Sequence, residues 1–329
     1  MKRWPLIALL LTLLLAPDPA PAGDQDQAEP PRGTYKSAAD VKAAHDRALV
    51  RDLEAYIQAN PKAEDLEQAY MMLFETVIEH DWFLDTEAAA KTYLARHPEG
   101  AVVPLARIVA AMARAQAGQF AEALPIYKEL IKGLDQDDQE EFASNFADSL
   151  ASAAMTAGAY KVAREVYETL LERFKDHREL HDKVRDDLAR LDMVGKPAPT
   201  LVVKDINGKL FRLSDLKGKY VLVDFWATWC APCVAELPNM QAAYNKYHAQ
   251  GLEIVGISLD ETKDPLLDFL KARKIPWRQI HNATSGGDAV EAFGVSTIPA
   301  TFLIGPDGTI LRLELRGPAL EKALNQLIK

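Results

Sequence analysis

The feature that most constrains this chain is a hydrophobic segment that leads directly into Cys230-Ala231-Pro232-Cys233. The run from Val221 to Ala227 predicts a buried strand, and the residues from Ala231 onward predict a helix. Cys230 would then lie at the first turn of that helix, where free backbone N–H groups and the positive end of the helix dipole favour a thiolate. Because only a thiolate attacks a disulfide, we expect Cys230 to be a nucleophile. Cys233, about one helical turn further on, would resolve the mixed disulfide.

The cysteine count favours redox chemistry over stabilisation. The sequence contains two cysteines, both in this motif, so a disulfide between them would close almost no loop. One alternative is half of a zinc site, for which a pair of histidines would have to supply the other ligands. Six histidines show no ligand spacing. His281 is expected in a loop, the alternative being a metal-binding or catalytic histidine. The other alternative is an inert disulfide, which an exposed motif preceded by Trp229 disfavours. No metal or cofactor is expected.

The N-terminal residues predict export. Lys2 and Arg3 precede an apolar run from Leu6 to Ala16, and Ala20-Pro21-Ala22 has the form of a cleavage site. We therefore interpret residues 1–22 as a signal peptide and residues 23–36 as a flexible linker. The alternative, an uncleaved membrane anchor, is disfavoured because the apolar run is about half the roughly 20 residues that a span requires. The mature protein is expected outside the cytoplasm, periplasmic or otherwise extracytoplasmic, with no integral membrane span. The net charge of −10 argues against nucleic acid as a partner.

Residues 37–193 have the periodicity of an all-α domain. Segments around Tyr56, Tyr93, Tyr127 and Tyr167 resemble one another, at spacings of 37, 34 and 40 residues. This pattern resembles degenerate tetratricopeptide repeats, whose period is about 34 residues. Gly118 and Gly158, each after an alanine, suit the turn between paired helices, while Ala123 and Ala163 suit close helix packing. A generic helical bundle is the alternative.

Residues 194–329 change to short strands alternating with helices, which predicts an α/β domain. Gly195-Lys196-Pro197-Ala198-Pro199 ends the preceding helix. Asn207-Gly208 and Asp307-Gly308 predict hairpin turns. Strands are expected at 201–204, 210–213, 220–227, 252–259, 277–281, 301–304 and 310–315. Helices are expected at 231–249, 264–273, 288–293 and 318–329.

The C-terminal region resembles the thioredoxin superfamily, in particular the extracytoplasmic TlpA/ResA/DsbE-type thiol-disulfide oxidoreductases of the redoxin (AhpC-TSA) group. The motifs agree in order, and the resemblance spans the whole region. It is carried by residues 195–199, by Phe225-Trp226-Ala227-Thr228-Trp229-Cys230-Ala231-Pro232-Cys233, by Glu236-Leu237-Pro238, by 255–260 and by Val295-Ser296-Thr297-Ile298-Pro299-Ala300-Thr301.

The resemblance implies roles at matching positions. Pro299 would be a cis-proline facing the dithiol, Ile298 would present its backbone to an extended substrate, and Trp229 would be an aromatic lid beside Cys230. The alternative for Trp229 and for Trp226 is a side chain of the hydrophobic core, and this alternative applies more to Trp226.

Two carboxyl groups near the motif are candidate catalytic residues. Asp224 interrupts an apolar strand, and a carboxyl buried there without a partner would have a raised pKa. In thioredoxin the aspartate at this place accepts the proton of the resolving thiol, whereas many ResA-type relatives carry another residue, so this chain departs towards thioredoxin. The alternative is a solvated edge carboxylate. Glu236 matches a glutamate that tunes the dithiol in ResA-like proteins, but it could equally be a surface helix residue.

Together these features predict an enzyme that exchanges disulfides with client proteins. We expect it to act as a reductant that receives its electrons from a thiol-disulfide donor. A redoxin-like peroxidase is an alternative, although the Pro-x-x-x-Thr-x-x-Cys pattern is absent before Cys230. A third function is a scaffold whose helical repeats bind a protein partner, with the redox domain accessory.

Overall fold

The computed structural model describes residue 35, residues 37–134 and residues 139–328. The predicted signal peptide, and the predicted linker apart from Tyr35 itself, lie outside the described residues. The chain forms two compact units, and each is described by itself. Among the described residues, the first unit contains those up to Ala153 together with Glu168–Phe174, and the second contains Ala154–Tyr167 together with the chain from Lys175 onward.

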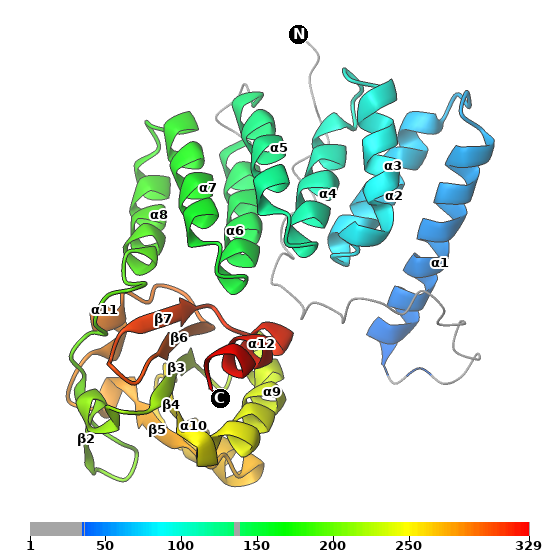
Figure 1. Ribbon diagram of the computed structural model, residues 1–329. Coiled ribbons are helices and arrows are strands. Elements are labelled where there is room, and N and C mark those ends of the chain that lie inside the picture. The colour runs from blue at the N-terminus through cyan, green and yellow to red at the C-terminus, as the bar shows by residue number, and fades with distance from the viewer. Residues whose placement is uncertain (1–34, 36, 135–138, 329) are drawn as a thin grey trace. The chain divides into compact units, whose positions relative to one another are not determined.

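The described residues before residue 192 form eight α-helices and no strand (Figure 1). In the first unit α1 packs on α2, and α3, α4 and α5 follow in order, each against its predecessor. Apolar side chains on one stripe of each helix supply this packing. The helices are α1 (Ala38–Ala59), α2 (Leu66–Glu79), α3 (Phe83–Arg96), α4 (Val103–Gln116), α5 (Phe120–Lys132), α6 (Glu140–Thr156), α7 (Tyr160–Arg173) and α8 (Arg178–Leu191).

The recurring segments fall on alternate helices. Tyr93, Tyr127 and Tyr167 are buried in α3, α5 and α7, but Tyr56 in α1 is 37% exposed. Equivalent turns follow α4 and α6, where Gly118 and Gly158 have φ of 74° and 78°. Such angles suit glycine, which carries no Cβ to clash. Ala123 and Ala163 are fully buried. A helical-repeat architecture accounts for these features; the tetratricopeptide class and a partner on the repeats stay predictions.

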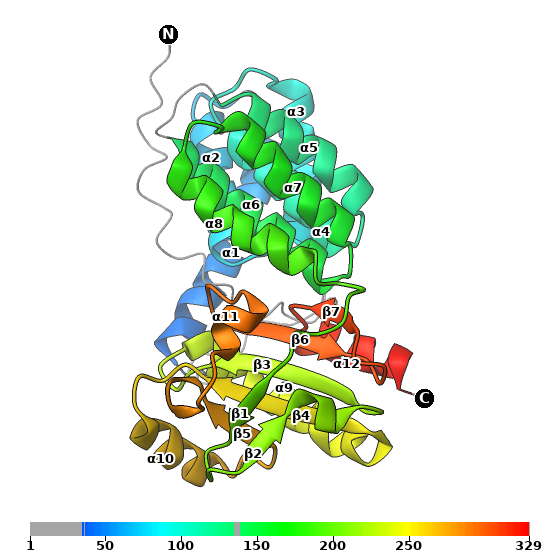
Figure 2. The same cartoon turned by 90° about the vertical axis from the view of Figure 1, so that its left-hand side faces the viewer.

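The second unit is built on a five-stranded mixed sheet with the order β5-β4-β3-β6-β7 (Figure 2). The central strand β3 pairs in parallel with β4 and antiparallel with β6. A separate antiparallel hairpin is formed by β1 and β2. The strands are β1 (Val202–Lys204), β2 (Leu210–Arg212), β3 (Tyr220–Trp226), β4 (Leu252–Ser258), β5 (Arg278–His281), β6 (Ala300–Ile304) and β7 (Ile310–Leu313).

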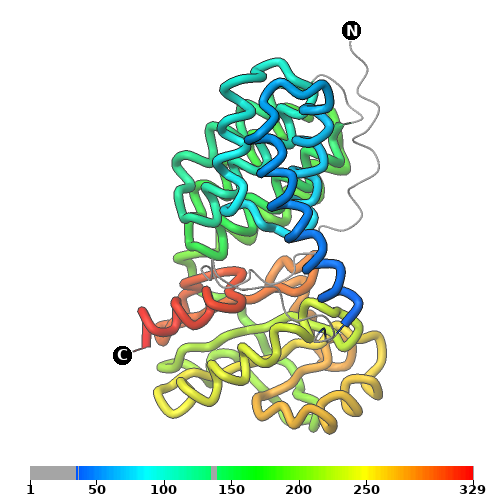
Figure 3. The backbone as a smooth tube through the Cα atoms, turned by 90° about the vertical axis from the view of Figure 1, so that its right-hand side faces the viewer, coloured from blue at the N-terminus to red at the C-terminus, as the bar shows by residue number. Residues whose placement is uncertain are grey.

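Helices cover both faces of this sheet. The β3-α9-β4 and β4-α10-β5 connections join parallel strands, and right-handed crossovers place both helices on one face. On that face α12 packs against α9 (Figure 3). The opposite face carries α11, whose Phe293 contacts Phe225 and Phe302. The helices are α9 (Ala231–Tyr247), α10 (Lys263–Arg273), α11 (Ala289–Phe293) and α12 (Gly317–Leu327).

The structure confirms the thioredoxin-like α/β fold after an all-α region. Each predicted strand and helix of this region is present, and bounds differ by a few residues at most. Both predicted hairpin turns join antiparallel strands, with Gly208 and Gly308 at positive φ. Among the residues that the structure describes, no helix combines the length and apolar character needed to cross a membrane.

Candidate active site

Cys230 and Cys233 form a disulfide at the start of α9. The buried strand β3 ends at Trp226, a short turn follows, and Cys230 becomes the N-cap residue of the helix. The backbone N–H of Cys233 points to Sγ of Cys230 at 3.3 Å. Pro232 occupies the first helical turn, where its missing N–H leaves no bond unmade. Negative charge on Cys230 would therefore meet both a backbone donor and the positive end of the helix dipole.

The two cysteines are buried, whereas the neighbouring Trp229 is exposed to solvent. Cys230 and Cys233 are only 5% and 3% exposed, because they pack into the cluster below α9, so the expectation of an exposed dithiol is wrong for the cysteines themselves. Trp229 is 66% exposed, which excludes a core role for it. Trp226 is core, at 1% exposure, and its Nε1–H donates to Oε1 of Gln279 at 3.1 Å.

An open hollow of about 490 Å³ lies beside Trp229. Its lining includes Asp260, whose carboxylate accepts hydrogen bonds from the backbone N–H and the hydroxyl of Thr228. These bonds fix the turn that presents Trp229 and Cys230. The lining residues are Thr228, Trp229, Asp260, Glu261, Thr262 and Pro265.

Asp224 is buried in the central strand of the sheet, with 4% exposure, so the alternative of a solvated edge carboxylate is wrong. Side chains alternate along a strand, which places Asp224 on the same face as Leu222 and Trp226, and these pack in the cluster that contains both cysteines. Burial raises the pKa of Asp224 to about 7. The charge of Arg316 opposes this rise, whereas Glu236 and Glu314 add to it.

Glu236 is also buried, at 4% exposure, which excludes a surface role. It lies one turn beyond Cys233 on α9. Its Oε1 accepts a hydrogen bond of 2.8 Å from the N–H of Gly317, and its Oε2 accepts one of 3.0 Å from Asn239. Glu236 therefore links the cysteine-bearing helix to the start of α12.

The segment before β6 contains a cis peptide bond between Ile298 and Pro299, as the resemblance implied. Both residues are half-buried, and Ile298 packs against the cluster that holds the cysteines. The carbonyl oxygen of Pro299 accepts a hydrogen bond of 2.6 Å from Nη2 of Arg316. The binding role of this segment stays a prediction.

Sequence reasoning missed Glu314 and Arg316. Glu314 is buried and has a φ of 55°, which is rare outside glycine and costs about 1–3 kcal/mol. This backbone turn directs the chain from β7 into α12 and brings the two side chains into an ion pair. Neither residue lies in a recognisable motif, so no local signal marked them. His281 is a third difference: it lies at the end of β5, within the strand expected at 277–281 and not in a loop, and it is buried, with its ring nitrogens near the Asp260 carbonyl and the Thr284 hydroxyl.

The site thus joins a disulfide at a helix N-terminus, a buried carboxyl with a pKa near neutrality and a cis-proline segment on a thioredoxin-like sheet. A dithiol in this setting cycles between the reduced and the oxidised form by thiol-disulfide exchange. Fold and site define an enzyme of the thiol-disulfide oxidoreductase class.

Comparisons with known proteins support the assignment to this class. Residues 194–312 match the AhpC/TSA family. The thiol-disulfide oxidoreductase ResA of Bacillus thuringiensis subsp. konkukian is 37% identical over 136 residues, which are 41% of this chain and 77% of that protein. ResA of Bacillus subtilis is 39% identical over 119 residues, 36% of this chain and 65% of that protein. The chain belongs to the family of ResA-type thiol-disulfide oxidoreductases.

Solved structures also resemble this chain. The thioredoxin domain of a thiol-disulfide oxidoreductase from Bacteroides vulgatus is 31% identical and covers 41% of this chain and 98% of its own, with a TM-score of 0.39. A thiol:disulfide interchange protein DsbE from Chlorobium tepidum is 32% identical and covers 41% of this chain and 94% of its own, with a TM-score of 0.37.

Proposed function

We propose that this enzyme reduces disulfides of client proteins outside the cytoplasm. The observation that carries the proposal is the buried Asp224 on the sheet face that packs with Cys230 and Cys233. A pKa near 7 allows this carboxyl to accept and release a proton at neutral pH. The exported setting is supported by the apolar leader of the sequence and by the kinship with ResA-type enzymes.

In the first step the Cys230 thiolate attacks one sulfur atom of a client disulfide. A bond forms between Cys230 Sγ and that sulfur, the client S–S bond breaks, and the other client sulfur leaves as a thiolate. Trp229, exposed beside Cys230, would hold the client, and the backbone of Ile298 and Pro299 would align its extended chain.

In the second step Cys233 resolves the mixed disulfide. Asp224 takes the proton of the Cys233 thiol, and the resulting thiolate attacks Sγ of Cys230. The second client sulfur leaves as a thiolate, and the enzyme is left with the Cys230–Cys233 disulfide present in this structure. The client gains two electrons and the enzyme loses two, so a thiol-disulfide donor must reduce the enzyme again.

Insulin reduction by the full-length mature protein tests the proposal, with dithiothreitol as electron donor. We expect turnover with the wild type and background turnover with Cys230→Ser; activity that survives this substitution overturns the assignment. The reduction potential then tests the direction. A value near that of thioredoxin, about −270 mV, supports a reductant, whereas a value near about −120 mV identifies an oxidant. Rapid turnover of hydrogen peroxide would identify a peroxidase instead.

A further inference from the structure

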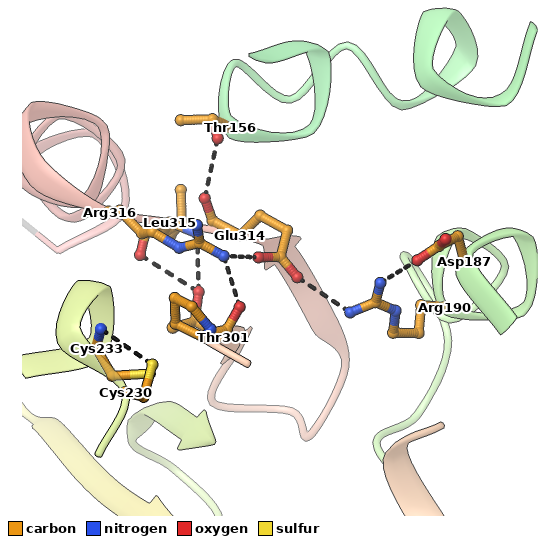
Figure 4. A network of polar contacts seen from close by, with 10 residues as sticks. Thr156, Asp187, Arg190, Cys230, Cys233, Thr301, Glu314, Leu315 and Arg316 are labelled. Carbon is orange, nitrogen blue, oxygen red and sulfur yellow. Dashed lines mark hydrogen bonds and ion pairs between the residues drawn. A yellow bond between two sulfur atoms is a disulfide. The ribbon is translucent and has the colours of Figure 1, made fainter. Parts of the chain in front are cut away.

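A continuous chain of polar contacts runs from α8 to the cis-proline segment within the second unit (Figure 4). Nη1 of Arg190 lies 3.3 Å from Oε1 of Glu314. The other carboxylate oxygen of Glu314 accepts a hydrogen bond from Nη2 of Arg316, and the same nitrogen donates to the carbonyl oxygen of Pro299. Arg190 is therefore linked to the cis-proline segment by the side chains of Glu314 and Arg316.

Further contacts support this network at Arg190 and at the backbone of Leu313 and Glu314. Asp187, one turn before Arg190 on α8, forms an ion pair with it. The hydroxyl of Thr156 donates to the carbonyl oxygen of Glu314 at 3.1 Å, and the N–H of Leu313 donates to the hydroxyl of Tyr160 at 3.0 Å. The β7–α12 connection is thus fixed by residues from the ends of three helices, α6, α7 and α8.

Three of the four charged side chains in this network are buried, and Arg316 is partly exposed. Asp187, Arg190 and Glu314 are 8%, 7% and 6% exposed. Burial lowers the pKa of Arg190, but the charges of Glu314 and Asp187 outweigh burial and raise it. Hydrophobic residues of similar volume often stabilise a fold as well as a buried ion network does, so stability alone does not explain these charges.

We propose that Arg190, Glu314 and Arg316 are positioning residues for the thiol-disulfide exchange, through which α8 holds the cis-proline segment and sets the charge around Asp224. Arg190 lies before residue 194, where the match to the AhpC/TSA family begins. The proposed positioning network therefore requires residues of the helical region as well as residues of the redox region. The inference rests on the proposed role of Asp224 as proton acceptor.

The expected direction of the change in the Asp224 titration follows from the charged groups that face Asp224. These are Arg316 at the start of α12, Glu236 on α9 and Glu314 after β7. Arg190 faces Glu314 and neutralises part of its charge. Without Arg190, the positive charge that offsets Glu314 is lost, and this loss makes ionisation of Asp224 harder. Without the Glu314 charge, ionisation of Asp224 becomes easier.

The test follows the titration of the Asp224 carboxyl carbon by ¹³C NMR in the full-length oxidised protein, where no thiol titrates alongside it; Asp224→Asn assigns the signal. We expect Arg190→Met to move the midpoint about 0.5 pH unit towards alkaline pH, and Glu314→Gln to move it towards acid pH. In the double variant the two opposite shifts should partly cancel, because the fields of the two charges at Asp224 add.

Two controls make the outcome decisive. Arg185→Met removes an exposed arginine from the same helix and should leave the Asp224 midpoint unchanged. Arg190→Lys retains the charge and should restore most of the wild-type midpoint. An unchanged midpoint in Arg190→Met, or shifts in the same direction in Arg190→Met and Glu314→Gln, overturns the proposal. If Arg190→Met does not fold, an unshifted midpoint in Glu314→Gln overturns it. Because the readout is independent of insulin reduction, failure of the proposed function would be seen separately.

Discussion

The backbone N–H of Gly317 donates a hydrogen bond of 2.8 Å to Oε1 of Glu236, which joins the first turn of α12 to the helix that carries both cysteines. This bond is buried and its acceptor is a carboxyl group, so Glu236 has two separable effects. It satisfies a backbone donor, and it places a negative charge near Asp224.

Substitution of Glu236 should separate these effects. Glu236→Gln keeps an acceptor for Gly317 but removes the charge that raises the pKa of Asp224, so the pH profile of insulin reduction should move towards acid pH. Glu236→Leu also leaves the Gly317 N–H without a partner and should lower the free energy of unfolding by about 1–3 kcal/mol. Urea denaturation measures the second effect. Equal stability of the two variants would contradict the role of the hydrogen bond.

Asp224 should reduce the stability of the oxidised protein at neutral and alkaline pH. Its folded pKa of about 7 lies above the ordinary value of 3.8, so the folded state holds the proton more tightly. The contribution of this group to stability is greatest below pH 3.8 and is lost as the pH rises to 7. Asp224→Asn should therefore stabilise the protein at pH 8 by up to about 4 kcal/mol. Denaturation of both proteins at several pH values measures the difference, and a constant difference would refute it.

The rate of client reduction should fall as the pH drops through about 7, because protonated Asp224 cannot accept the proton of Cys233. The midpoint is a property of the coupled carboxyl and thiols rather than of Asp224 alone. Rapid-mixing measurements of insulin reduction by the reduced enzyme give the profile. Asp224→Asn should be slower by about 100- to 10,000-fold at pH 8 and should lack this step. A profile that both proteins share would remove Asp224 from the mechanism.

Substitution of the two tryptophans near the motif should have different effects, on client binding for Trp229 and on stability for Trp226. Trp229 is 66% exposed, so Trp229→Ala should change stability by less than about 0.5 kcal/mol but raise KM for insulin. Trp226 is 1% exposed, and Trp226→Ala should cost about 3–5 kcal/mol of stability. Thermal denaturation and steady-state kinetics distinguish these results. Unchanged KM in Trp229→Ala would argue against a role in client binding.

Local patterns predicted most of the redox region. The alternation of short apolar runs with helical segments located the strands and helices, and Asn207-Gly208 and Asp307-Gly308 located the hairpins. The same patterns were less informative for the repeats, where Tyr56 shares a sequence pattern with Tyr93 but not its burial. A side chain at an end helix of an array has a neighbour on one side only, which the pattern of its own segment does not report.

The sequence by itself determined the cysteine pair, the strand and helix that present it, and the candidate carboxyl groups, because each depends on residues close together in the chain. Only the tertiary structure decided that Cys230 and Glu236 are buried, and that Arg190 meets Glu314 across 124 residues. The electrostatic environment of a carboxyl such as Asp224 depends on which charges are brought near it and on how much water is removed. Both quantities are properties of the packed chain.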